Sequence, residues 1–380
     1  MGPPPPAPLP DELVEEILLR IPPSDPATLA RAAVAQKRWC RLVAGPGFCR
    51  RYRDRHRAPP MLGFFCFPWS GNGFSTSFVP ASSFRPKPRA DRRQLGPVDA
   101  RHGRVLLRAY ERFRGGVVPG FRLVVWDPIT RHRVALPRPK GLCDEWEWSA
   151  TVLCAAPAGS CDHLDCHSGH FIVVLISNYP EGMLSCVYSS QAGAWGKIAR
   201  HLYRHSLGYE MSSAHVGNAL YCMLDWGNKI LRFDLRTREF SVMEPPVLLS
   251  RERYTERIQL TTMEDGQLAL AVLRKSTLYI LSTDEEFGWG GTNIIDLEKC
   301  GNYVPSTTTP SLIGFAGDIG LVFLNTGNNG ILSVDIRSAQ VKVVDKRPCI
   351  SRIVPYINFC TPALGAAFRG EGPSEGGSNE

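Results

Sequence analysis

The chain has 380 residues, and its 44 Lys and Arg outnumber its 36 Asp and Glu, for a formal net charge of +8. This mild excess, with a pI near 8.9, falls short of the basic composition of a dedicated nucleic-acid-binding domain. Apolar residues make up 43% of the chain, enough for a sizeable core, but no apolar run reaches the roughly 18 residues of a membrane span. The 31 prolines and 35 glycines argue against a long helical bundle or coiled coil.

The twelve cysteines are scattered, and the opening Met-Gly-Pro-Pro-Pro-Pro has neither the basic start nor the apolar stretch of a secretory signal. This pattern predicts free thiols in a reducing compartment, the cytoplasm or the nucleus. Residues 1–8, mostly proline, predict a disordered leader. Residues 369–380, rich in Gly and Glu, predict a disordered tail.

Residues 9–57 have the pattern of short helices. Pro10 suits a helix start, and Leu13, Ile17 and Ile21 recur every four residues, as on one face of an amphipathic helix. The following Pro22 cannot continue that helix, so we expect the helix to end just before it.

A second helix is predicted directly afterwards. Asp25 suits the N-cap and Pro26 the first helical position, and Leu29 begins a small apolar face. Trp39 lies in a third short helix, and residues 48–57 continue as a basic helical tail that we expect to be a solvated face joining two domains.

Residues 60–365 change to short apolar runs separated by Gly, Pro, Asn and Asp, which favours strands. The runs are Arg104 to Ala109, Phe121 to Trp126, Phe171 to Ile176, Gly182 to Tyr188, Ala219 to Leu224, Lys229 to Leu235, Gln267 to Leu273, Thr277 to Leu281, Ile319 to Leu324 and Ile331 to Ile336. A weak repeat of strand, polar turn and return strand recurs at Trp126-Asp127, Tyr188-Ser189, Phe233-Asp234 and Val334-Asp335. Such hairpins, about 45 residues per pair, predict a β-propeller-like domain with six or seven blades.

The helical region resembles an F-box over about 45 residues. The resemblance is carried by Leu9-Pro10-Asp11-Glu12-Leu13, Glu16-Ile17-Leu18-Leu19-Arg20-Ile21-Pro22, Leu29-Ala30-Arg31-Ala32-Ala33, Lys37-Arg38-Trp39-Cys40-Arg41-Leu42-Val43 and Gly45-Pro46-Gly47-Phe48. The whole layout is similar to plant proteins, especially from grasses, that join an F-box to a β-propeller-like associated domain. The expected fold is therefore a three-helix F-box at residues 9–57 followed by a β-propeller at residues 60–365.

This resemblance implies a non-catalytic role. F-box proteins bind a Skp-family adaptor, which connects them to a cullin and a RING protein in an SCF-type ubiquitin ligase, while the remaining domain binds a target protein. The resemblance places these residues at or just behind the adaptor surface: Leu9, Pro10, Leu13, Ile17, Leu18, Leu29, Trp39, Leu42 and Val43. Periodicity alone favours the alternative that they form the core of a helical bundle fused to the propeller.

Cysteines and histidines crowd into one short stretch, with Cys161, His163, Cys166, His167 and His170 within ten residues. Thiolate and imidazole groups could bind zinc, but structural zinc sites usually draw a second ligand pair from a distant segment, and none is evident. We therefore expect a loop and assign no metal and no cofactor.

Three rival functions remain. A propeller enzyme or ligand-binding protein with a helical cap would need a buried polar pocket in the central channel. An F-box scaffold could bind its partner without degradation. The arginine-rich segment, residues 50–57, could bind nucleic acid, although charge runs on helices are more often solvated.

Overall fold

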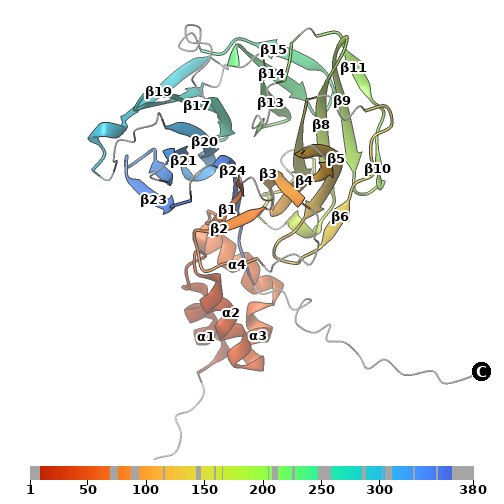
Figure 1. The fold of residues 1–380 in the computed structure, drawn as a ribbon. Helices are drawn as coiled ribbons and strands as arrows, with labels where there is room; N and C mark the ends of the chain where they lie inside the picture. Colours follow the sequence, from red (N-terminus) through yellow and green to blue (C-terminus); the bar gives the residue numbers. More distant parts are fainter. Residues whose placement is uncertain are drawn as a thin grey trace, which may run out of the picture.

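The computed structural model consists of four helices followed by six β-sheets arranged in a ring (Figure 1). It describes residues 9–68, 76–86, 94–113, 116–142, 147–157, 160–164, 166–203, 205–207, 213–224, 227–246, 258–284, 288–301, 303, 310–327, 330–347 and 350–361. The predicted leader and tail lie outside these residues.

The four helices share one apolar core. They are α1 (Asp11–Leu19), α2 (Pro26–Ala35), α3 (Lys37–Val43) and α4 (Pro46–His56). The start of α2 is as predicted, because the Asp25 side chain accepts a hydrogen bond from the Thr28 N–H at 3.3 Å and Pro26 is the first helical residue. The expected count of three helices needs one addition. The basic tail is a fourth helix, and Phe48 and Tyr52 bury its apolar side in the helical core.

The six sheets form the blades of a propeller, within the predicted range of six or seven. The closing blade contains β1 (Met61–Pro68), β2 (Ser77–Pro80) and β24 (Ile350–Ile357). The second blade contains β3 (Gln94–Arg101), β4 (Arg104–Phe113), β5 (Gly116–Trp126) and β6 (Arg133–Ala135). The third contains β7 (Trp148–Cys154), β8 (Phe171–Tyr179), β9 (Gly182–Ser189), β10 (Ala194–Trp195) and β11 (Ala199–His201). The fourth blade contains β12 (Ser213–Val216), β13 (Ala219–Leu224), β14 (Lys229–Asp234) and β15 (Phe240–Met243). The fifth contains β16 (Ile258–Thr262), β17 (Leu268–Arg274), β18 (Thr277–Thr283) and β19 (Trp289–Asp296). The sixth contains β20 (Ser311–Ala316), β21 (Leu321–Asn325), β22 (Ile331–Asp335) and β23 (Val341–Asp345).

The ring is closed by strands from opposite ends of the propeller sequence. β1 pairs antiparallel with β24, for example Phe64 with Pro355, so one blade joins both ends of the propeller. The innermost strand of each blade faces the central channel, and β24 lies between β20 and β3 there. Closure completes the ring and leaves only the short outer edge of each blade exposed.

The repeated Asp in the predicted hairpins stabilises the same turn three times. The Asp127 carboxylate accepts hydrogen bonds from the backbone N–H groups two and three residues later, at 2.8 and 3.1 Å. Asp234 does the same at 2.9 and 3.0 Å, and Asp335 at 2.9 and 3.0 Å. Asp favours such turns because its side chain replaces a backbone acceptor. The three hairpins are β5–β6, β14–β15 and β22–β23, which confirms the repeat.

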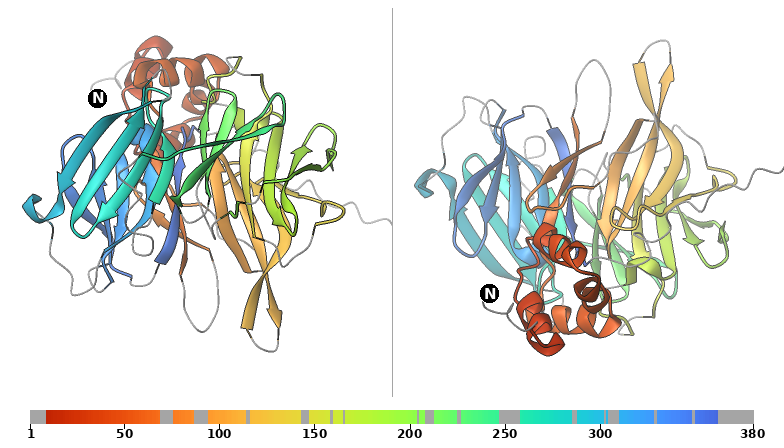
Figure 2. Two further views of the ribbon diagram at one scale, coloured as in Figure 1. Left: turned by 90° about the horizontal axis from the view of Figure 1, so that it is seen from above. Right: turned by 90° about the horizontal axis from the view of Figure 1, so that it is seen from below.

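The helices lie outside the ring, beside the closing blade (Figure 1), and are displaced toward one face of the propeller (Figure 2). Phe359, just after β24, is buried in the helical core. The Ser83 hydroxyl, just after β2, donates to the Asp25 carboxylate at 2.7 Å. Both ends of the closing blade therefore hold the helical unit.

Candidate functional site

One face of α1 is apolar and exposed to solvent. Leu9, Leu13 and Ile17 are spaced four residues apart and are 51, 52 and 54% exposed. Leu13 and Ile17 lie one above the other on the same side of α1, and Leu9 precedes the helix by two residues. We call these three residues the α1 stripe. Single exposed apolar side chains are ordinary on a protein surface, but a contiguous row of large ones is typical of an interaction site.

The opposite face of α1 is also apolar, and it is buried. Val14, Leu18 and Leu19 are at most 6% exposed and pack in the helical core with Leu29 and Val43. One face therefore holds the helix on its own chain, while the second face has no such cover among the described residues.

The nine residues that the sequence places at the adaptor surface fall into three groups. The exposed residues are Leu9, Pro10, Leu13 and Ile17. The buried residues are Leu18, Leu29 and Val43. The half-buried residues are Trp39 and Leu42, which pack at the margin of the helical core. Leu13 and Ile17 thus lie together on α1, Leu9 and Pro10 directly precede that helix, and the other five residues are buried or half-buried in the helical unit.

Sequence reasoning missed one exposed apolar residue of the helical unit. Val34 on α2 is 82% exposed, whereas Ala33 and Leu29 on the same helix are buried. A helical step of about 100° separates Val34 from Ala33, so the buried face of α2 excludes it. In the sequence, the signal for this exposed residue is that Val34 is apolar but lies outside the helical spacing of the buried residues of α2.

The arginines of α4 hold α1 in place. Arg51 forms an ion pair with Glu15, and Arg55 lies 3.3 Å from the Glu16 carboxylate. The ring Nε2 of His56 is 2.9 Å from the Leu19 carbonyl oxygen. Exposed ion pairs of this kind contribute about 0.2–1 kcal/mol each, so they orient the helix more than they stabilise it. They also neutralise part of the basic run, which weakens the case for nucleic-acid binding.

Tyr52 of α4 contacts both the rest of the helical unit and Phe359, which follows the propeller strand β24. The Tyr52 hydroxyl donates to the Ile21 carbonyl at 2.9 Å, and its ring lies 6.2 Å from that of Phe359. Burial raises the pKa of the Tyr52 phenol, which stays protonated as a donor. These contacts give the α1 stripe a defined orientation relative to the propeller.

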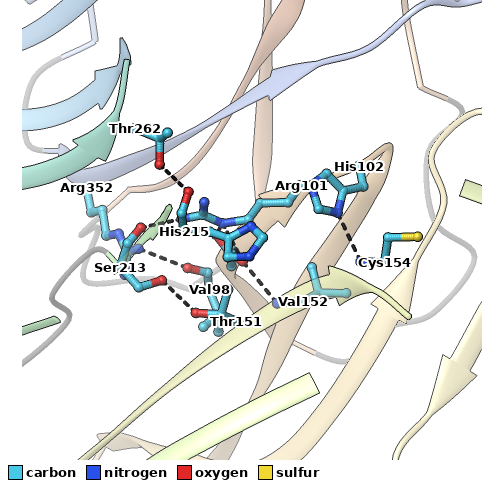
Figure 3. A network of polar contacts seen from close by, with 11 residues as sticks. Val98, Arg101, His102, Thr151, Val152, Cys154, Ser213, His215, Thr262 and Arg352 are labelled. Carbon is cyan, nitrogen blue, oxygen red and sulfur yellow. Dashed lines mark hydrogen bonds and ion pairs between the residues drawn. The ribbon is translucent and has the colours of Figure 1, made fainter. Parts of the chain in front are cut away.

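The central channel is polar, as the rival enzyme hypothesis requires, but its groups bind one another (Figure 3). The Asp99 carboxylate accepts from Arg101 at 3.2 Å and from the Val152 N–H at 3.0 Å. Arg101 also donates to the Ser213 carbonyl oxygen, and Arg352 donates to the Val98 carbonyl oxygen at 2.9 Å. The network joins innermost strands of neighbouring blades.

The cavity within this channel has a volume of about 100 Å³. Ligand pockets typically measure about 300–1,000 Å³, so the space suits a few water molecules. Burial lowers the pKa of His102 to about 2 and that of His215 to about 4, so both imidazoles are neutral at pH 7. The channel therefore favours a structural role over a substrate pocket.

The crowded Cys and His stretch separates into two parts. Cys161, His163 and Cys166 gather around Cys154, and one ligand atom of each residue lies within 4.8 Å of the others. His167 points elsewhere, and its Nδ1 is 2.7 Å from the Asp127 carboxylate. His170 is exposed and is not part of the cluster.

These observations define a class of protein, a six-bladed β-propeller with an N-terminal helical unit that exposes an apolar stripe. A family model described as "F-box protein AT5G49610-like, beta-propeller" matches residues 98–364, most of the chain. The chain belongs to this family. The four helices precede the matched residues.

Other comparisons add little. Among solved structures, a chain of the "Crystal structure of Nidogen/Laminin Complex" is similar at a TM-score of 0.41 and 10% identity, over 78% of this chain and 98% of that chain. No curated protein matches. Among the described residues, no helix has the length and apolar character needed to cross a lipid bilayer.

Proposed function

We propose that this chain is the substrate-recognition subunit of an SCF-type ubiquitin ligase. The α1 stripe binds a Skp-family adaptor, which connects the chain to a cullin and a RING protein, and the propeller binds a target protein. The observation that carries the proposal is the second apolar face of α1, where Leu9, Leu13 and Ile17 are each about half exposed. The family, whose description names an F-box protein, supports the same role.

The chemistry of the stripe suits helix-in-groove binding. An amphipathic helix that binds a partner presents apolar anchors at intervals of three and four residues, and Leu13 and Ile17 on α1 have this spacing. The buried face of α1 and the ion pairs from α4 present these anchors already in helical form. Binding then costs less ordering of the chain than it would for a flexible peptide.

In this role the chain contributes proximity rather than catalysis. Holding a target beside the ubiquitin-transfer enzyme raises the effective concentration of target lysines. The helical unit is attached to the closing blade by Asp25, Tyr52 and Phe359, so the distance between adaptor and propeller is held nearly constant.

Binding to a purified Skp-family adaptor tests the proposal. Ile17→Asp puts a charge in the middle of the α1 stripe and should abolish capture of the adaptor. Val343→Asp is the matched control, because Val343 is 53% exposed on the outer strand β23, far in sequence from the helices. Equal capture by the wild type and both variants, or no capture by any of them, would contradict the proposal.

A further inference from the structure

We propose that Cys154, Cys161, His163 and Cys166 bind a zinc ion. Three sulfur atoms and one imidazole nitrogen lie within 4.8 Å of one another, and Cys166 Sγ is 3.8 Å from His163 Nδ1. Zinc–ligand distances of about 2.0–2.3 Å give a tetrahedron with edges of about 3.5–3.8 Å. The four groups already lie close to this arrangement, so small shifts of their side chains complete it.

The ligands come from one hairpin. Cys154 is the last residue of β7, and the other three lie in the connection to β8, with Cys166 starting the short helix η1 (Cys166–Ser168). Their spacing is Cys-x6-Cys-x-His-x2-Cys. A strand end and a short turn supply ligands that are held before the metal arrives, which suits a structural site.

Backbone donors surround the sulfur atoms. The Ala156 N–H donates to Cys154 Sγ and the His163 N–H donates to Cys161 Sγ, each at 3.4 Å and each from two residues later in the chain. Hydrogen bonds to the ligand atoms are typical of metal sites, where they orient the ligands.

The His163 ring is held by a second histidine. The His102 ring stacks on it at 4.0 Å, with 12° between the ring planes. His102 Nδ1 in turn accepts the Cys154 N–H at 3.0 Å (Figure 3). His102 thus orients one ligand and fixes the backbone of another, as groups behind metal ligands commonly do.

A buried positive charge lies beside the cluster. Arg104 is 2% exposed, and its Nη2 donates to the carbonyl oxygens of Cys166 and Gly169, both at 2.6 Å. Its Nη1 is buried with no hydrogen-bond partner among the described residues. A zinc ion with three thiolates and a neutral imidazole has a net charge of −1, which the guanidinium would balance.

The ligand set selects the metal. Three sulfurs and one nitrogen suit zinc and are poor ligands for Mg²⁺ or Ca²⁺, which prefer oxygen. Four protein ligands leave no open position for a substrate, so the site is structural rather than catalytic.

The bound metal would brace the junction between propeller and helices. Leu164 lies between two of the ligands and packs against the helical core. On the other side of Cys166, His167 contacts Asp127 in the β5–β6 turn. Zinc would hold this loop against both parts of the chain. The metal site itself does not depend on the proposed ligase function.

Metal analysis of the purified full chain, produced with zinc in the medium, tests the site. We expect about one zinc per chain in the wild type and near zero in Cys154→Ser. The matched control is Cys186→Ser, which lies in the same sheet, is more deeply buried than Cys154 and should retain zinc. Because a ligand variant could fail to fold, cobalt substitution of the wild type gives a second measurement. The cobalt protein should show sulfur-to-metal charge transfer and the intense visible bands of tetrahedral coordination.

Three results would overturn the inference. These are wild-type chain without zinc or tetrahedral cobalt, unchanged zinc in Cys154→Ser, and an intact-mass measurement that shows a disulfide among the three cysteines in freshly purified protein. The expected accompanying result is a lower Tm after zinc is removed with a chelator, since metal-binding free energy in such sites is also folding free energy.

Discussion

The two apolar faces of α1 should respond to substitution in opposite ways. We predict that replacing Leu9, Leu13 and Ile17 together by Ala weakens adaptor binding strongly and destabilises the folded chain less, per side chain, than truncation of a fully buried residue. The three side chains are already half exposed in the free chain, so their truncation opens no cavity. Alanine is also at least as good a helix former as Leu or Ile.

The magnitude follows from the exposed fractions. Full burial of a Leu or Ile side chain contributes about 1.5–3 kcal/mol. With 51, 52 and 54% still exposed, each residue has about half of that to gain from a partner. The three together should contribute about 2.4–4.7 kcal/mol to binding, which corresponds to a loss of about 50-fold to a few thousand-fold in affinity.

Calorimetric titration with the adaptor measures the affinity, and thermal denaturation measures the stability. Leu18→Ala is the converse variant, because Leu18 is 3% exposed and a buried Leu→Ala change costs about 2–5 kcal/mol of folding free energy. If the triple variant lowered the Tm as much as Leu18→Ala while adaptor affinity was unchanged, the stripe would belong to the fold and the reasoning would be refuted.

Three further predictions concern how the chain is held together. Asp25→Ala removes both the α2 cap and the acceptor for Ser83, so protease cleavage near residues 57–60 should accelerate, whereas Asp25→Asn should largely retain wild-type resistance. The hydrogen bond from the Thr237 backbone N–H, first among several, lowers the pKa of Asp234. The Asp234 carboxylate therefore contributes its full stabilisation above the unfolded pKa of about 3.9, and this stabilisation is lost as pH falls through the lower folded pKa. The Tm of Asp234→Asn should consequently show a smaller acid dependence below about pH 4 than that of the wild type. Gly330→Ala should lower the Tm by several degrees, because φ is +81° there and a Cβ would lie 2.1 Å from the Asp345 carbonyl oxygen; an unchanged Tm would contradict this.

The helix boundaries of the helical unit could be predicted from the sequence where single proline or capping residues mark them. Pro22 follows the end of α1, and Asp25 with Pro26 starts α2, because proline and capping residues act locally. The burial of α4 was not readable. Its arginines dominate the composition, and only Phe48 and Tyr52, four residues apart, indicate the face that packs inward.

The ten runs predicted as strands all fall on strands, and most are central strands of their blades. In β13 and β17 nearly every side chain is buried, so the sequence is almost continuously apolar. Among the innermost strands, β16 was missed because it faces the channel with polar side chains, where Gln259 and Thr261 interrupt the apolar pattern. Polar groups that face the channel form hydrogen bonds with residues of other blades. These partners are distant in sequence, so a local sequence pattern does not reveal them.

Closure of the ring could not be predicted for a similar reason. β1 and β24 are separated by nearly the whole propeller, and the pairing of Phe64 with Pro355 depends on the number and twist of the blades between them. The hairpin turns were visible because each Asp contacts its own backbone two and three residues later. The hairpin turns, which depend on local interactions, were therefore predicted, whereas the pairing of β1 with β24 was not.

The fourth ligand of the cysteine cluster shows where the sequence argument stopped too early. A second ligand pair was sought in a distant segment, yet Cys154 lies only seven residues before Cys161. β7 was not among the predicted strands, so Cys154 at its end was not considered as a ligand. In an antiparallel hairpin the last residue of one strand faces the first of the next, and Cys154 pairs with Phe171. The connecting loop must return to that point, which brings Cys161 and Cys166 back to the strand end from which the loop began.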